Sequence, residues 1–317
     1  MATEFDIIAD YFSWPQQDQS VALSVGDDAA LVRISENHEL VISVDTLVSG
    51  IHYPPDTPAA SIAYKALMVN LSDLAAMGAK PKWFTLALTL PEQNKDWLSD
   101  FSKALRAVSE EYNVALIGGD TTRGSETITI QMMGEAEKGQ SLQRSRALSG
   151  DLLCLTHSTG DAGAGLAIYD QHADNNFSEA QEYCLNRLMR PTARVKESKV
   201  IKNYANACID VSDGLLQDLS HLLKASQLGA VINTDTFKLS SALDSLYPRE
   251  EALKLALSSG DDYELLFTIP ETSLGTLAVE MDANNYSFQV IGQLNSDINT
   301  IRDQAGSALN PMGFQHF

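Results

Sequence analysis

The chain has 317 residues, 44% of them hydrophobic and 20% charged, which is ordinary for a globular protein with room for two compact domains. Its 22 basic residues stand against 42 acidic ones, a formal net charge of -20 at pH 7. This excess argues against a protein that binds nucleic-acid phosphates through basic patches, and implies that a bound nucleotide needs metal ions as intermediaries.

Cysteine usage and the N-terminal sequence indicate the compartment. Cys154, Cys184 and Cys208 are widely spaced and form no CxxC pair, which predicts reduced thiols. The first segment, MATEFDIIADYF, is acidic and lacks the basic start and apolar core of a signal peptide. No apolar run is long enough to span a bilayer. We therefore expect a cytoplasmic protein without a membrane anchor.

The first half of the chain reads as mixed helix and strand. Alternating apolar residues predict two strands, then a helix, a strand, a second helix and two more strands. In chain order these lie at 29–34, 38–48, about 58–77, 83–90, about 95–112, 114–119 and 127–137. The polar segment 137–151 then separates this half from the next apolar strand. We place a domain boundary there, between residues 138 and 139.

The second half alternates strands and helices more regularly. A strand at 152–157 leads into a glycine-rich turn at 158–165 and a helix, and a further helical region covers 178–190. The remaining elements are a strand at 206–212, a helix at 213–226, and strands at 263–269 and 288–294.

Acidic residues cluster where these elements end. Gly26 precedes two adjacent carboxylates, Asp27 and Asp28, which repel each other unless a cation or a solvated turn accommodates them. Asp45 ends the strand at 38–48, where an isolated aspartate commonly makes a turn, and His52 follows it.

The helix at about 58–77 carries a carboxylate at its unfavourable end. Asn70 and Asp73 share one face, and Gly78 supplies the C-terminal stop. A carboxylate near a helix C-terminus opposes the helix dipole, so either a salt bridge to a residue such as Lys80 or a metal ion must compensate it.

Three further acidic junctions follow. LIGGDTTRG, residues 116–124, is either a glycine-rich hairpin turn or a place where Asp120 holds a metal and Arg123 meets an anion. In CIDVSDGLLQDL, residues 208–219, helix capping explains Ser212 or Asp213 but leaves Asp210 unexplained. SSGDDYELLFT, residues 258–268, repeats the pattern of a glycine before two aspartates.

Other chemistries lack their motifs. The chain has no GxxxxGK[ST] loop, GxSxG, HExxH, EF-hand loop or protein-kinase motif set. GDAGAGL, residues 160–166, either brings a helix N-terminus to a phosphate or is simply a tight strand-to-helix turn. The acidic junctions taken together predict an oxygen-ligand Mg²⁺ site with more than one ion bridging phosphates.

The order of these motifs resembles one family over nearly the whole chain. GDDAAL, SVDTLVSGIHY, AYKALMVNLSDLAAMGAKPKW, LIGGDTTRG, RPTARV, IDVSDGLLQDLSHL, SGDDYELLFT and GFQHF are similar to the motifs of the thiamine-monophosphate kinase family. That family belongs to the aminoimidazole ribonucleotide synthetase and selenophosphate synthetase superfamily. The resemblance implies a two-domain α/β (α+β) fold in which N-terminal strands form a barrel across a homodimer interface.

The resemblance also implies a reaction and a division of labour. Residues 1–138 would bind ATP and Mg²⁺ and dimerise, and 139–317 would complete the metal and substrate site. The reaction would be direct transfer of the ATP γ-phosphate to thiamine monophosphate, giving thiamine diphosphate and ADP. Metal ligands by resemblance are Asp28, Ser43, Val44, Asp45, Asp73, Asp120, Asp210 and Asp213, with Asp45, Asp73 and Asp120 the catalytic ones. ATP contacts would be Gly119, Asp120, Arg144 and Ser212, and substrate contacts His52, Asp261 and Phe314.

Three positions depart from the family pattern. Val44 stands where many relatives have threonine, which leaves a metal contact to its backbone carbonyl. Asp261 replaces a commoner glutamate, and Arg146 a commoner glycine near Arg144. Two other functions stay open: a sister ATP-dependent synthetase with another acceptor, and a non-catalytic nucleotide- or metal-binding module. A selenophosphate synthetase is disfavoured because the first cysteine is Cys154.

Overall fold

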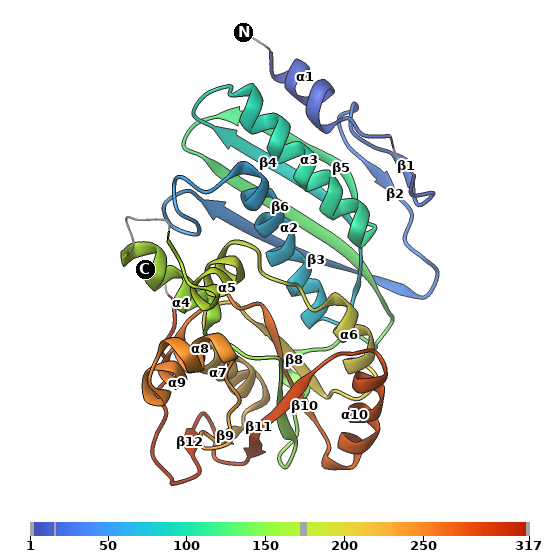
Figure 1. Ribbon diagram of the computed structural model, residues 1–317. Helices are drawn as coiled ribbons and strands as arrows, with labels where there is room; N and C mark the ends of the chain where they lie inside the picture. The colour runs from blue at the N-terminus through green and yellow to red at the C-terminus, as the bar shows by residue number, and fades with distance from the viewer. Residues whose placement is uncertain (1–2, 16, 172–175, 315–317) are drawn as a thin grey trace. The chain divides into compact units, whose positions relative to one another are not determined.

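The computed structural model describes residues 3–15, 17–171 and 176–314 (Figure 1). The chain divides into two compact units, Met1–Leu74 with Ala79–Gly139, and Ala75–Gly78 with Gln140–Phe317. Within the described residues, no helix combines the length and apolar character needed to cross a membrane.

A four-stranded sheet organises the first unit. Its strands are β3 (His38–Val48), β6 (Thr127–Glu137), β4 (Lys80–Leu90) and β5 (Ala115–Arg123), in that order across the sheet. Only the β4–β5 pair is parallel. In β4, buried Leu86 and Leu88 alternate with the more exposed Thr85 and Ala87, so one face of the sheet is apolar and covered.

Two long helices cover that apolar face. They are α2 (Ala59–Ala76) and α3 (Lys95–Tyr112), drawn over the sheet in Figure 1. Asn94 caps α3 by accepting two backbone N–H groups, and Asn113 ends it in the left-handed conformation. Gly78, at φ 66°, follows the end of α2 as the sequence predicted.

The N-terminal elements are short, and of them the sequence analysis predicted only the second strand. They are α1 (Glu4–Ile7), a π-helical turn at Ile8–Phe12, and a two-stranded ribbon of β1 (Val21–Leu23) and β2 (Leu31–Val32). The strand predicted at 29–34 is therefore only two residues long. A hydrogen bond from Trp83 Nε1 to Ser20 Oγ, 3.0 Å, ties the start of the ribbon to β4.

A six-stranded sheet organises the second unit. Its order is β12 (Ile301–Asp303), β9 (Gly229–Ile232), β11 (Phe288–Asn295), β7 (Leu152–Thr156), β10 (Glu264–Ile269) and β8 (Ala207–Val211). All neighbours are antiparallel except β12 and β9. β7, β8 and β10 are almost wholly buried, which explains their uninterrupted apolar sequences.

Helices enclose this sheet and build two cores. They are α4 (Asp161–Gln171), α5 (Glu179–Met189), α6 (Val195–Ile201), α7 (Leu215–Ser226), α8 (Ser241–Leu246), α9 (Arg249–Ser258) and α10 (Leu274–Ala283). Leucines of α7 pack on the sheet in the larger core, and α4, α5 and α8 share a smaller one. The predicted glycine-rich turn at 158–165 is wrong in its second half, because α4 already begins at Asp161.

Candidate functional site

The first unit contains a cavity of about 600 Å³ beside the N-terminal turn. Its lining includes the acidic residues Glu4, Asp27, Asp28 and Asp120 and the glycines Gly118 and Gly119. Apolar residues, among them Phe5, Ile8, Phe12, Leu116 and Ile117, also line it. Asp28 and Asp120, which are 92 positions apart in the sequence, thus open onto one space.

A bulge in β5 lies beside this cavity. Phe84 pairs with Leu116 and Thr85 with Gly118, so one extra residue lies in β5 between the two pairs. Gly119 then lies so close to β4 that a Cβ added to it would be 1.9 Å from the carbonyl oxygen of Leu86. The glycine-rich hairpin proposed as an alternative for 116–124 is therefore wrong, since most of this segment is a strand.

The N-terminal turn uses its two adjacent carboxylates differently. Asp27 Oδ1 accepts the backbone N–H of Asp28 at 2.8 Å, which fixes the turn. Both residues are exposed. Both line the cavity, Asp27 also fixes the backbone of the turn, and Asp28 is the predicted metal ligand of the pair.

The predicted residues of β3 and α2 meet. Ser43 Oγ donates to the Asp73 carboxylate. Asn70, which is buried, accepts the backbone N–H of Asp45 at 3.2 Å. Val44 points to the other face of β3 and is 59% exposed. The Asp45 N–H points away from β6, toward Asn70. Backbone groups of successive strand residues point to alternate sides, so the Val44 carbonyl points toward β6. A metal ion at this carbonyl would have to share it with the backbone of β6.

His52 has defined partners in its own unit. Its Nδ1 accepts the Val48 N–H at 3.0 Å, and its carbonyl oxygen accepts from the buried Lys65 ammonium at 3.0 Å. The bond at Nδ1 places the proton of a neutral ring on Nε2. These bonds hold His52 in the turn that follows β3.

In the second unit, a buried carboxylate holds the DVSDG turn. Asp218 Oδ2 accepts the backbone N–H groups of Ser212 and Asp213 at 3.0 Å and of Gly214 at 3.2 Å. Burial raises the pKa of Asp218 to about 7 in spite of these donors, and the nearby Asp213 charge adds to the shift. The expectation that Asp213 or Ser212 caps α7 is wrong: Gly214 occupies the cap position, and Asp218 accepts the free N–H groups. Asp210 lies buried at the end of β8.

The second Gly-Asp-Asp segment forms a strained loop. Asp261 and Tyr263 have φ angles of 68° and 52°, in the left-handed region that non-glycine residues rarely adopt. The Asp261 N–H donates to the Ser212 carbonyl at 2.8 Å, and the Tyr263 hydroxyl donates to the Asp261 carboxylate at 3.0 Å. The loop therefore presents Asp261 beside the DVSDG turn.

Asp262 has a structural role at the start of α4. Its carboxylate is fully buried and accepts the N–H groups of Gly160 at 2.6 Å and Ala162 at 3.4 Å. Burial raises the pKa of Asp262 well above its usual range. An internal carboxylate thus occupies the helix N-terminus that GDAGAGL had suggested for a phosphate, which supports the tight-turn interpretation.

An ion network lies beneath this loop. Glu264 is fully buried and accepts from Arg187 Nη2 at 2.9 Å, from Arg194 Nε at 2.7 Å and from the Thr156 hydroxyl at 2.6 Å. Arg187 also donates to the Asp262 carbonyl at 3.1 Å. Glu264 and the RPTARV motif, which contains Arg194, thus make the second unit rigid.

Arg144 and Phe314 lie at the edges of the same unit. Arg144 is exposed in a short 3₁₀ turn, and its carbonyl accepts the Ser226 hydroxyl at 2.7 Å. The Phe314 N–H donates to the Asp213 carbonyl at 3.0 Å, so the predicted substrate residue lies next to a predicted metal ligand. Of the GFQHF motif, the last three residues lie outside the described residues.

The donors fit a hard cation in kind. The candidates are carboxylate and hydroxyl oxygens, which are the ligands that Mg²⁺ takes, few per ion and completed by water. Among the described residues, no group of three or more His, Cys, Asp or Glu side chains gathers tightly enough to hold a metal alone.

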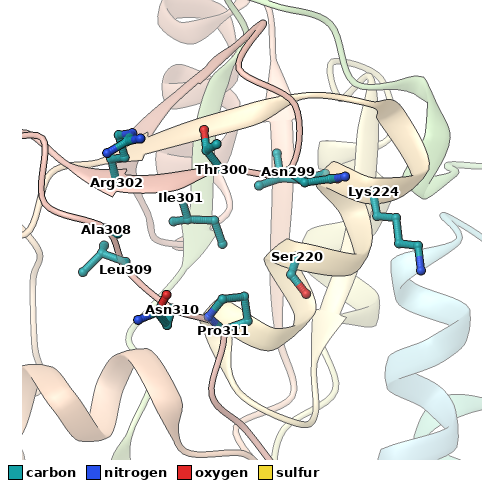
Figure 2. Close-up of a pocket in the computed structure, with 11 residues that line it drawn as sticks. Ser220, Lys224, Asn299, Thr300, Ile301, Arg302, Ala308, Leu309, Asn310 and Pro311 are labelled. Carbon is teal, nitrogen blue, oxygen red and sulfur yellow. The ribbon is translucent and has the colours of Figure 1, made fainter.

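A second cavity, of about 360 Å³, lies elsewhere in the second unit (Figure 2). Ser220 and Lys224 of α7, Ile301 of β12 and Leu309 and Pro311 of the C-terminal segment are among the residues that line it. None of the predicted site residues does.

Comparison with known proteins identifies the family. The family models for the N-terminal and C-terminal domains of AIR synthase related proteins match residues 26–136 and 149–301. Thiamine-monophosphate kinase of Escherichia coli K12 is 44% identical over 99% of this chain and 98% of its own length. The chain belongs to the thiamine-monophosphate kinase family.

Solved structures of this family match the whole fold. Thiamine-monophosphate kinase from Stenotrophomonas maltophilia K279a, 40% identical, has a TM-score of 0.87 over 92% of this chain and 93% of its own. AaThiL complexed with AMPPCP and TMP, 29% identical, has a TM-score of 0.80 over 93% of this chain and 92% of its own. The two-domain α/β fold expected from the resemblance is confirmed.

The sequence analysis missed two groups of residues at the site. The apolar lining residues Phe5, Ile8 and Phe12 come from short elements with no detectable periodicity. Asp218 does carry a signal, because it lies four to six positions after the three N–H groups that it accepts. Its spacing from the DVSDG turn could have revealed it.

Proposed function

We propose that this chain transfers the γ-phosphate of ATP to the phosphate of thiamine monophosphate, giving thiamine diphosphate and ADP, the last step of thiamine diphosphate biosynthesis. The observation that carries the proposal is the cavity of the first unit, whose lining combines acidic residues, glycines and apolar side chains. Acidic residues and glycines suit a metal-bound polyphosphate, and apolar side chains suit a base. The similarity to AaThiL in complex with AMPPCP and TMP supports the same reaction.

The proposed reaction requires little covalent chemistry from the protein side chains. The acceptor is a phosphate and already a good nucleophile, so the residues need to align two anionic substrates for direct in-line transfer. Bound Mg²⁺ ions would offset the negative charge of both substrates. This accounts for nucleotide binding by a protein with a net charge of -20.

We divide the roles between the two domains as the resemblance implies. Residues 1–138 bind ATP and Mg²⁺ and dimerise, and residues 139–317 supply the other metal ligands and substrate groups. In the first domain the proposed ligands are Asp28, Ser43, Val44, Asp45, Asp73 and Asp120, and Gly119 lets the nucleotide approach the backbone closely. In the second, Asp210 and Asp213 are proposed as ligands, Arg144 and Ser212 as ATP contacts, and Asp261 and Phe314, with His52 of the first domain, as substrate contacts.

An exposed apolar strand face supports the proposed homodimer. Leu40, Ile42 and Val44 lie on one face of β3 and are 37%, 52% and 59% exposed. β3 is an edge strand, and an exposed apolar edge invites pairing with another chain. We propose that a second copy covers it in a shared barrel, and we expect analytical ultracentrifugation to show a dimer. The cytoplasmic location stays a prediction from the sequence.

The decisive assay measures ADP formation with and without thiamine monophosphate. We expect ADP only when thiamine monophosphate and Mg²⁺ are both present. Substitution of Asp45 or Asp120 by alanine should nearly abolish turnover and leave the circular dichroism spectrum unchanged. Asp100→Ala, an exposed position on α3, is the matched control and should keep its rate.

Two results would contradict the proposal. ADP formation that does not depend on thiamine monophosphate would favour a sister synthetase with another acceptor, and no ADP at all would favour a binding module. Near-normal rates in both aspartate variants at saturating Mg²⁺ would remove the assigned site.

A further inference from the structure

A single carboxylate oxygen organises the turn that carries Ser212 and Asp213. Asp218 lies in the first part of α7, is 3% exposed, and accepts three consecutive backbone N–H groups on Oδ2, from Ser212, Asp213 and Gly214. These N–H groups precede the helix and have no intrahelical carbonyl to bond. The carboxylate therefore replaces the missing helical turn.

Two other segments of the second unit attach to this same turn. The Asp261 N–H donates to the Ser212 carbonyl at 2.8 Å, and the Phe314 N–H donates to the Asp213 carbonyl at 3.0 Å. Gly313 packs so closely that a Cβ there would lie 2.5 Å from the Asp213 carbonyl oxygen. The turn thus has Asp218 on its N–H side and the two substrate-side segments on its carbonyl side.

We infer that Asp218 is a positioning residue for both substrates: it fixes the Ser212–Gly214 turn, and through it the places of Asp213, Asp261 and Phe314. The roles of those residues rest on the proposed function. The positioning itself rests on the hydrogen bonds. Without the acceptor, the buried Gly214 N–H and the half-buried N–H groups of Ser212 and Asp213 lose their partner, and the turn must rearrange to reach water. Both attached segments then lose their alignment.

The test compares three variants in the full-length protein. Asp218→Leu keeps the side-chain volume and removes the acceptor, and Asp218→Asn keeps a neutral acceptor oxygen in the same place. Asp151→Leu is the matched control, because Asp151 is also 3% exposed in the same unit and accepts the Leu148 N–H at 2.9 Å, but touches none of the site residues. Steady-state kinetics are measured for each substrate, with hydrogen exchange of the peptide that contains residues 212–214.

We expect Asp218→Leu to lower kcat/KM about 100-fold, with KM rising for both ATP and thiamine monophosphate, as small misplacements of positioned groups do. Its 212–214 amides should lose exchange protection in the absence of substrate. Asp218→Asn should restore kcat/KM to within about threefold of the wild type, because an amide oxygen accepts the same bonds. Asp151→Leu should lose stability yet keep both KM values. If the role of Asp218 were only structural, Asp218→Leu would behave in the same way.

Three results would overturn the inference: wild-type kinetics in Asp218→Leu, unchanged exchange at 212–214, or an Asp218→Asn variant as inactive as the leucine one, which would assign the effect to charge. If Asp218→Leu does not fold, Asp218→Glu keeps the charge and displaces the oxygen by one methylene. It should then lose at least about tenfold in kcat/KM, and wild-type kinetics there would overturn the inference. The two proposals can fail separately. If the wild type makes no thiamine-monophosphate-dependent ADP but Asp218→Leu shows increased exchange at 212–214, the proposed function is refuted and the positioning role of Asp218 stands.

Discussion

Replacing Glu264 by alanine should unfold the second unit at much lower denaturant concentration. The side chain is fully buried and accepts from Arg187, Arg194 and Thr156. Removing one partner of a buried ion pair typically costs about 3–5 kcal/mol, because the remaining charge is left uncompensated. Arg194 keeps Glu197 at 3.3 Å, so we expect the lower part of this range, with about 1 kcal/mol more for the Thr156 hydroxyl.

The expected loss of about 4 kcal/mol converts to a measurable shift. With a slope of about 2 kcal/mol per molar urea, the unfolding midpoint of the second unit falls by about 2 M. Far-UV circular dichroism follows both units, whereas tryptophan fluorescence follows the first unit, since the tryptophans are Trp14, Trp83 and Trp97. We therefore expect a lowered transition in circular dichroism and little change in the unfolding transition reported by fluorescence.

The control is an ion pair at the surface. Arg106 and Glu110 lie 2.8 Å apart on α3 with side chains that are largely solvent-exposed, and Glu110→Ala should change stability by no more than about 0.5 kcal/mol. Glu264→Gln keeps the shape without the charge and should fall between the two. A Glu264→Ala midpoint within the range of the surface control would refute the reasoning, because it would mean that water compensates both guanidinium groups.

Three further outcomes follow from the structure. Gly119→Ala should destabilise the first unit by about 1–3 kcal/mol, seen in tryptophan fluorescence during urea unfolding, because its Cβ would meet the Leu86 carbonyl oxygen. Gly118→Ala, where the nearest atom would be 3.9 Å away, should not, and equal losses would contradict the contact. The three cysteines should resist thiol reagents at pH 8 in the folded protein and react on unfolding. All three are buried, and burial raises the pKa of Cys184 to about 12. Rapid labelling of the folded protein would contradict this. Asp262→Asn should gain stability relative to the wild type as pH rises above about 4, by up to about 1.4 kcal/mol per pH unit. In the wild type the unfolded carboxyl ionises above about pH 4, whereas burial raises the pKa of the folded one and so shifts its ionisation to higher pH. Parallel stability profiles of the two proteins from pH 4 to pH 8, measured by urea unfolding, would exclude this ionisation difference.

The parts of the fold that sequence predicted well are those with local signals. The strand at 38–48 and the helix at 95–112 agree with β3 and α3 to the residue, because alternation and the Asn94 cap are properties of neighbouring positions. Of the two short strands, β1 was not predicted, and β2 is only two residues long within the strand predicted at 29–34. The partners of Glu264 lie 70 to 108 positions away in the sequence, so the residues next to Glu264 in the sequence do not indicate an ion network.

Candidate site residues could be located but not sorted by role. Asp120 reads as a turn residue beside two glycines, yet a bulge set by the register against β4 places it in a strand that borders a cavity. Asp213 reads as a helix cap, yet the capping is done by Asp218. In both cases the local sequence gives the right region, and a tertiary partner decides the role of each side chain.

The two Gly-Asp-Asp segments show why adjacent carboxylates are tolerated in this chain. At 26–28, both carboxylates are exposed and line the cavity, and Asp27 also accepts the Asp28 N–H. At 260–262, Asp262 is buried and accepts the N–H groups that begin α4, whereas Asp261 is partly exposed and accepts the Tyr263 hydroxyl. Solvent therefore weakens the repulsion within the first pair. In the second pair, burial raises the pKa of Asp262 and so favours its neutral form, which removes one of the two charges.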